Sequence, residues 1–274
     1  MISFGSVSLR YPGAPEPALN DVTVAVRDGE MLAVIGANGS GKSTLGRLAN
    51  ALLLPTAGTV TVDDVDTRSP GGRAEARRRV GMVFQNPDAG IVSSSVEEDV
   101  AFALENRALP RAVIKARVDE TLETLGLVGQ RQAHPHSLTT SERARLGLAA
   151  AVVGSPRYLV MDEATAYLDP ADRAALLSAV GSVRARTTMA VVIITHVMEE
   201  ALGADRVAVL SGGELVFLGL PRNLFADPAR ARAWRLELPP LLQLEEELRE
   251  RGVDVGGGGD ALSVNATLER LCRL

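Results

Sequence analysis

The chain has 274 residues and a formal net charge of −5, with 46% hydrophobic and 23% charged residues, which is typical of a globular protein. A weakly acidic chain without a basic stripe is not expected to bind nucleic acid as its main partner. We find no run of about 18 apolar residues and expect no signal peptide, so membrane association should depend on a partner protein. Cys272 is the single cysteine, which excludes an intramolecular disulfide and suits a reducing cytosol.

Strands and helices alternate along most of the chain. Apolar runs predict strands at Ile2–Leu9, Val22–Val26, Met31–Ile35, Gly58–Val62, Val80–Phe84, Tyr158–Met161, Ala190–Thr195, Val207–Leu210 and Glu214–Leu218. Helical periodicity predicts helices at Ser43–Leu54, on both sides of Pro110 within Val96–Leu125, and at Ser141–Val153, Ala171–Arg184 and Glu199–Leu202. Gly212 and Gly213 predict a hairpin turn between the last two strands.

This order predicts an α/β fold with a largely parallel sheet and an antiparallel subsheet formed by the early strands. The mostly helical segment 84–156 is expected to form a lobe outside the sheet. After about residue 220 the composition changes, and a charged helix at Leu241–Arg251, a flexible glycine run at 256–259 and a final helix from Val264 are expected. We interpret this region as a small C-terminal appendage.

A glycine-rich loop follows the strand that ends at Ile35. Its residues fit the pattern G-x-x-x-x-G-K-[ST] between a strand and a helix: Gly36, Ala37, Asn38, Gly39, Ser40, Gly41, Lys42, Ser43 and Thr44. Backbone N–H groups of such a loop and the following helix N-terminus bind phosphate oxygens. Lys42 is expected to reach the β- and γ-phosphates of a nucleotide, and the Ser43 hydroxyl to ligate Mg²⁺. The alternative is a purely structural turn.

A pair of carboxylates, Asp162 and Glu163, ends the apolar strand that starts at Tyr158. The tip of a strand beside a phosphate loop is the place for a Mg²⁺ ligand, and Asp162 suits that role. Glu163 is expected to polarise the attacking water as a general base. A solvated, idle pair is the alternative.

With these motifs the sequence resembles an ABC ATPase over residues 3 to about 225. The resemblance implies a P-loop NTPase (RecA-like) core with an antiparallel β subdomain, a helical subdomain at about 86–156 and a dimerisation appendage at 226–274, with the ATPase domain spanning 1–225. It implies ATP and Mg²⁺ as cofactors. It assigns Gln85 to the Q-loop, where it couples Mg²⁺ and water to the membrane subunit.

The same resemblance assigns three further residues. Asp169 is similar to the D-loop aspartate, His196 to the switch histidine that contacts the γ-phosphate, and Tyr11 to the aromatic residue that stacks on adenine. Each has a structural alternative: a lone histidine is often structural, and an aromatic side chain is often only packed.

Within the ABC group, three stretches resemble the energy-coupling factor ATPases, which power vitamin and metal uptake. They are Gln85–Asp88 followed by Val96–Phe102, Glu163–Thr165 leading to Leu168–Pro170, and the appendage at Pro239–Leu248 with Gly252. The resemblance implies a second ATPase, a transmembrane coupling subunit and a membrane substrate-binding subunit as partners. It places the chain at the cytoplasmic face of the membrane, held there by the transmembrane partner.

The chain departs from the family at the signature, where Leu-Ser-Gly-Gly-Gln is normally presented to the ATP of the opposite subunit. The aligned residues are Leu138, Thr139, Thr140, Ser141 and Glu142. Both glycines are absent, an acid replaces the glutamine, and Thr139 with Glu142 predicts a capping box. We therefore expect a heterodimer with one competent and one degenerate site. The alternatives are a slow homodimer, a conventional ABC transporter ATPase, and a regulatory ATP-binding subunit with little turnover.

Overall fold

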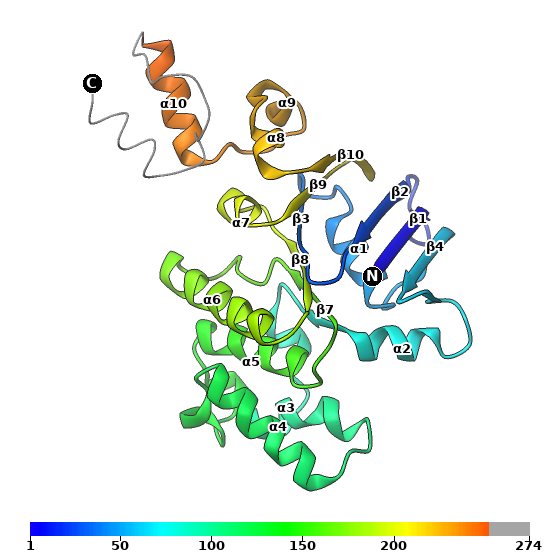
Figure 1. Ribbon diagram of the computed structural model, residues 1–274, viewed down its shortest axis with the longest axis vertical. Helices are drawn as coiled ribbons and strands as arrows, with labels where there is room; N and C mark the ends of the chain where they lie inside the picture. The colour runs from blue at the N-terminus through cyan, green and yellow to red at the C-terminus, as the bar shows by residue number, and fades with distance from the viewer. Residues whose placement is uncertain (252–274) are drawn as a thin grey trace.

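The computed structural model describes residues 1–251 (Figure 1). The expected glycine run at 256–259, the helix from Val264 and Cys272 lie outside the described residues. Among the described helices, none combines the length and the apolar character that are needed to cross a membrane.

The larger sheet has six strands and carries most of the expected strands. Their order across the sheet is β10 (Glu214–Gly219), β9 (Arg206–Ser211), β3 (Met31–Ile35), β8 (Ala190–Ile194), β7 (Tyr158–Asp162) and β6 (Val80–Val83). All neighbours pair in parallel except the β9–β10 hairpin. Every residue of β7 and β8 is buried, because helices cover both faces of a parallel sheet. The predicted parallel sheet is confirmed.

The smaller sheet is antiparallel, as the early strands predicted. Its order is β2 (Leu19–Val26), β1 (Ile2–Leu9), β4 (Ala57–Val62) and β5 (Val65–Asp66). Ile2, Phe4, Val7 and Leu9 of β1 point into the core. Helix α1 (Lys42–Ala49) packs between the sheets, against β4, β7 and β8. This packing fixes the start of α1 beside the ends of β7 and β8.

A helical lobe lies at the end of the molecule opposite the C-terminal helices (Figure 1). It contains α3 (Val96–Glu105), α4 (Arg111–Thr124) and α5 (Thr140–Val152). Its core is aliphatic, with Val100, Leu104, Leu122 and Leu146 all nearly inaccessible. Helix α6 (Pro170–Arg186) follows the lobe and β7, and α7 (Met198–Leu202) follows β8.

Short C-terminal helices follow β10, and the first of them contacts β9 and β10 of the larger sheet. They are α8 (Pro221–Phe225), α9 (Pro228–Ala233) and α10 (Pro240–Glu250). Leu236, in the loop between α9 and α10, is buried in the same apolar cluster as Ile35 and Met198. The loop after α9 is therefore held against the residues that precede the phosphate loop and follow His196.

One local expectation was wrong, and one helix was not predicted. The helix predicted over Ser43–Leu54 ends at Ala49, because Ala51 adopts a left-handed φ of 53° and the N–H groups of Leu52 and Leu53 bond back to Arg47. Helix α2 (Gly72–Arg79) was not predicted, because Ala76 is its only buried side chain and no apolar stripe marks it.

Candidate functional site

The candidate residues follow the carboxyl ends of four parallel strands. Segment 36–44 follows β3, Gln85 follows β6, Asp162 and Glu163 end β7, and His196 follows β8. These ends meet at one edge of the sheet, where α/β proteins bind ligands. A cavity of about 740 Å³ opens there, lined by residues 36–39 with Gln85, Glu163 and His196.

The loop between β3 and α1 can hold its shape only with glycine at two positions. Gly36 has a φ of 152°, and a Cβ atom there would lie 2.2 Å from the Leu210 carbonyl oxygen. Gly41 has a φ of 102°, and its Cβ would lie 2.5 Å from the Ala18 carbonyl oxygen. Side chains are excluded by both backbone conformation and space, so the loop is built to present its backbone.

Lys42 is buried and turned onto the loop itself. Its Nζ donates hydrogen bonds to the carbonyl oxygens of Gly36 at 2.8 Å and Ala37 at 3.1 Å. Burial lowers the pKa of Lys42, and the nearby carboxylates of Glu163 and Asp162 act in the opposite direction. The ammonium is thus held within the loop, where it would exchange two carbonyl contacts for an anionic ligand.

Ser43 and Asp162 are in direct contact. The Ser43 hydroxyl donates a 2.7 Å hydrogen bond to Asp162 Oδ1. Burial raises the pKa of Asp162, although the Ser43 hydrogen bond opposes the shift. A hydroxyl and a buried carboxylate side by side provide the oxygen ligands that Mg²⁺ takes from a protein when phosphates and water complete its shell. The residues present therefore fit a magnesium ion.

Gln85, Glu163 and His196 converge on one carboxylate oxygen. Gln85 Nε2 donates to Glu163 Oε2 at 3.1 Å, and His196 Nδ1 lies 3.6 Å from the same oxygen. Glu163 has a left-handed φ of 49°, an uncommon conformation that is often found at functional sites. The amide of Gln85 is bonded to Glu163 here, so its expected role as a metal ligand stays a prediction.

Tyr11 lies away from this group. Its hydroxyl is 3.1 Å from Thr44 Oγ1, and its ring packs against the apolar core. The cavity described above, as formed by residues 1–251, does not include Tyr11 in its walls. Stacking of Tyr11 on adenine therefore remains a prediction.

Asp169 caps a helix in the structure. Its carboxylate accepts a 2.8 Å hydrogen bond from the Asp172 N–H in the first turn of α6. The preceding Tyr167 lines the cavity and is 66% exposed. Earlier in the same loop, Thr165 donates a 2.6 Å hydrogen bond to buried Glu200 of α7, which ties this loop to the segment after His196. No motif or periodicity in the sequence predicts that link.

The predicted capping box at the start of α5 is confirmed. Thr139 Oγ1 accepts from the Glu142 N–H at 3.3 Å, and Glu142 Oε2 accepts from the Thr139 N–H at 2.9 Å. The hydrogen bond from the Thr139 backbone is the main cause of a lowered pKa of Glu142. As formed by residues 1–251, the cavity beside the phosphate loop has none of residues 138–142 in its lining.

One wall of the cavity was missed altogether. Arg235, Leu236 and Glu237, which follow α9, line the same cavity as residues 36–39 of the phosphate loop. No motif or periodicity marks these residues, because their position depends on how the C-terminal helices pack on the sheet.

Comparison with known proteins places this geometry in a family. The model of the ABC transporter family matches residues 19–166. The chain is 49% identical over 257 residues to the energy-coupling factor transporter ATP-binding protein EcfA1 of Symbiobacterium thermophilum, covering 94% of this chain and 89% of that protein. It is 38% identical over 278 residues to EcfA1 of Clostridium perfringens, covering 100% of this chain and 98% of that protein.

Solved structures agree with this assignment. The structure of cbiO1 from Clostridium perfringens, part of the ABC transporter complex cbiONQ, has a TM-score of 0.77 and 30% identity, covering 89% of this chain and 98% of that one. The ATP-binding cassette MJ0796, bound to ADP and Pi, has a TM-score of 0.74 and 25% identity, covering 81% and 99%. The expected P-loop NTPase fold is confirmed. The chain belongs to the ABC transporter family, as an ATPase of the energy-coupling factor group.

Proposed function

We propose that this chain powers an uptake transporter of the energy-coupling factor type, for a vitamin or a transition-metal ion, as one half of a heterodimer of two different ATPases. The main support for the proposal is a difference between the phosphate-loop side and the signature side of the chain. The residues expected to hold and hydrolyse ATP are gathered at one sheet edge, whereas the signature segment has a closed capping box in place of glycines.

The phosphate-loop side has the groups that hydrolysis needs. The N–H groups of the loop and Lys42 bind the phosphates, and Glu163 accepts the proton of the water that attacks the γ-phosphorus. His196 and Gln85, both near Glu163 Oε2, orient that carboxylate and the water. Mg²⁺ held by Ser43 and Asp162 would supply charge neutralisation at the β- and γ-phosphates. The products are ADP and inorganic phosphate.

The signature side lacks what a second ATP would need. Glycine allows the backbone to approach a phosphate closely, and Thr140 and Ser141 carry side chains in its place. The capping box occupies a helix N-terminal donor with Thr139 Oγ1 and leaves the Glu142 charge at that end. One lost charged hydrogen bond to phosphate costs about 1.5–3 kcal/mol, or about one to two decades in affinity or rate. A partner with an intact signature would complete the competent site.

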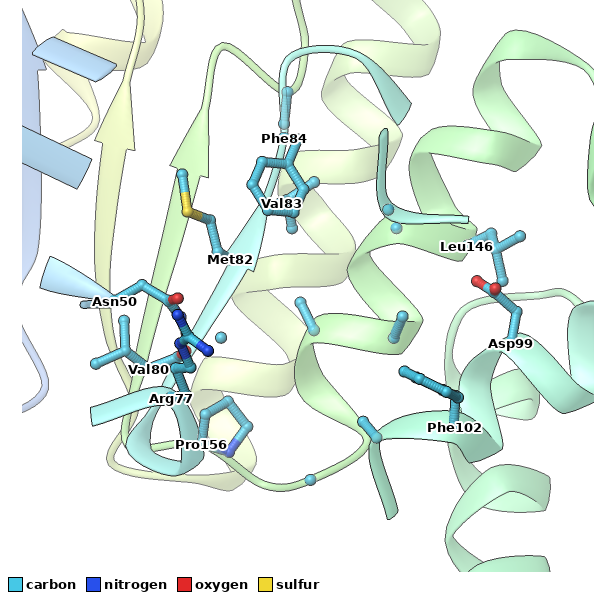
Figure 2. A pocket seen from close by; sticks show the side chains of 18 of the residues that line it. Asn50, Arg77, Val80, Met82, Val83, Phe84, Asp99, Phe102, Leu146 and Pro156 are labelled. Carbon is cyan, nitrogen blue, oxygen red and sulfur yellow. The ribbon is translucent and has the colours of Figure 1, made fainter. Parts of the chain in front are cut away.

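A groove between the larger sheet and the helical lobe suits a helix of the transmembrane subunit (Figure 2). Its volume is about 400 Å³, and Met82, Phe84, Phe102 and Leu146 give it an apolar lining. Phe102 is 44% exposed, which leaves an aromatic anchor uncovered. Phe84 directly precedes Gln85, which contacts Glu163, so movement of a helix bound in this groove would be transmitted to the nucleotide site. The transported substrate would bind a separate membrane protein.

A regulatory ATP-binding subunit with little turnover is a second candidate, favoured by the same capping box. Phosphate release by the complete complex separates the two. We expect steady-state hydrolysis that falls by at least about a hundredfold with Glu163→Gln, whereas Lys42→Ala prevents ATP binding. Hydrolysis that is unchanged by Glu163→Gln would contradict the proposed role of this chain, because the partner would then provide all turnover.

A further inference from the structure

The cavity beside the phosphate loop has one wall made by the C-terminal region. Arg235, Leu236 and Glu237 line it, together with residues 36–39, Glu163 and His196. The family-model match ends at residue 166, so these three residues lie well outside it. They belong to the region that the sequence analysis assigned to dimerisation.

A tight helix ending fixes the position of Arg235. After α9, the Arg235 N–H bonds to the Arg232 carbonyl at 2.8 Å and the Leu236 N–H bonds to the Ala231 carbonyl at 3.0 Å. This pair of bonds is a Schellman motif, whose turning residue adopts a left-handed conformation and is usually glycine. Arg235 has a φ of 58°. An arginine thus occupies a position that the backbone would favour for glycine.

Leu236 holds the turn against the site. It is 6% exposed and shares an apolar cluster with Ile35, which directly precedes the phosphate loop, and with Met198, two residues after His196. Burial of Leu236 in this cluster places its two charged neighbours at the cavity. The wall is therefore packed onto the same elements that carry the phosphate loop and the switch histidine.

The charge of Arg235 is uncompensated within the described part of the chain. Among residues 1–251 its guanidinium has no hydrogen-bond or ion-pair partner, and it is the single arginine that lines the cavity. Lys42 lies buried within the loop, on its carbonyl groups. A non-glycine, cationic residue that keeps a positive φ and lines the cavity beside the phosphate loop indicates a use for its side chain.

We propose that Arg235 contacts the terminal phosphate of the nucleoside triphosphate bound at the phosphate loop. This inference rests on the proposed nucleotide site. A guanidinium binds phosphate oxygens through directed, charge-assisted hydrogen bonds. Because ADP lacks the γ-phosphate, the contact favours ATP over ADP and links the C-terminal region to the state of the nucleotide.

The test measures binding of a non-hydrolysable ATP analogue and of ADP, each with Mg²⁺, to the full-length chain. Arg235→Gly removes the cation at a position where glycine fits the backbone, so the variant should fold and melt no lower than wild type. We expect affinity for the ATP analogue to fall by about ten- to a hundredfold, while ADP affinity stays within about twofold. Arg235→Asn, which also tolerates positive φ, should behave in the same way.

Two further variants serve as matched controls. Arg235→Lys keeps the charge and should retain part of the preference for the ATP analogue. Glu237→Gln, on the same wall, removes an opposing charge and should not weaken binding of the analogue. An unchanged ratio of the two affinities in Arg235→Gly and Arg235→Asn, or an equal loss for both nucleotides, would overturn the inference.

The proposed site itself is tested in the same assay. Lys42→Ala should abolish binding of both nucleotides. If Lys42→Ala still binds nucleotide, the proposed nucleotide site is wrong. If Lys42→Ala loses binding but Arg235→Gly binds the ATP analogue and ADP with wild-type affinities, only the role of Arg235 is refuted.

Discussion

The Ser43 hydroxyl donates a 2.7 Å hydrogen bond to Asp162 Oδ1, although the two residues are 119 positions apart. Ser43 lies in the first turn of α1 and Asp162 is the last residue of β7. The contact joins the phosphate loop to the strand that carries Glu163. The contact gives the buried carboxylate of Asp162 a hydrogen-bond donor, and the same carboxylate would be a ligand of Mg²⁺.

Asp162→Asn should stabilise the nucleotide-free chain while it impairs catalysis. Because burial raises the pKa of Asp162, its ionised form costs stability above that pKa, and the cost disappears as pH falls through it. The variant should therefore melt at a higher temperature than wild type at pH 7 to 8. The difference should shrink as pH falls toward the ordinary aspartate pKa of about 3.9.

Thermal melts of both proteins across this pH range, without nucleotide, check the first part of this prediction. Phosphate release should fall by about two orders of magnitude or more, since the site loses a charged metal ligand. A variant that melts below wild type at neutral pH would show that the carboxylate contributes net stability, contrary to this account.

Asp63→Asn should destabilise the chain with the opposite pH dependence. Burial alone would raise the pKa of Asp63, but hydrogen bonds from the Tyr158 hydroxyl, the Met1 ammonium and Arg79 outweigh it and lower the pKa to about 2. A depressed pKa contributes stability that is complete above about pH 4 and is lost as pH falls to about 2. We expect a loss on the order of 2 kcal/mol at pH 7.

Asp64→Asn is the matched control for Asp63→Asn. Both aspartates have left-handed backbones, with φ of 48° and 66°, and asparagine tolerates that conformation. Asp64 is exposed, so its substitution should change stability by less than about 0.5 kcal/mol. Chemical denaturation at pH 7 and pH 3 compares the three proteins. Equal effects of the two substitutions would contradict the account of the Asp63 cluster.

Restoring the signature should raise activity. In the complete complex, Thr140→Gly and Ser141→Gly combined with Glu142→Gln should increase steady-state phosphate release by up to about twofold, because the second ATP gains backbone contacts and its site adds turnover to that of the competent site. Glu142→Gln alone removes the charge and retains a residue that can form the capping box, so it should have the smaller effect. No increase in the triple variant would refute the degenerate-site explanation.

Phe102→Asp should uncouple the chain from its membrane partner. The side chain is 44% exposed in the groove, so a charge there should leave folding and ATP binding intact while it disfavours an apolar helix. Co-purification with the transmembrane subunit should be lost. Val128→Asp, at a 55% exposed site outside this groove, should have no effect. Loss of the partner in both variants, or in neither, would contradict the assignment of the groove.

Local sequence patterns predicted the helices and strands in which buried residues recur at the spacing expected for that element. The apolar runs of β7 and β8 predict strands because all their residues are buried. Gly212 and Gly213 predict a hairpin turn, and both residues adopt a positive φ in that turn. Helix α2 was missed because it is polar on nearly all sides. The contiguous phosphate loop could be identified from sequence, whereas the wall at Arg235 could not, because it arises from tertiary packing of Leu236 against Ile35 and Met198.

Native mass spectrometry tests the heterodimer most directly. The complex would be purified from its own membranes through a tag on this chain carrying Glu163→Gln, with Mg-ATP present to keep the ATPases closed. We expect one copy of this chain with one different ATPase that has an intact signature, together with a transmembrane subunit. Two copies of this chain without another ATPase would show that residues 138–142 form a working signature and would contradict the proposal.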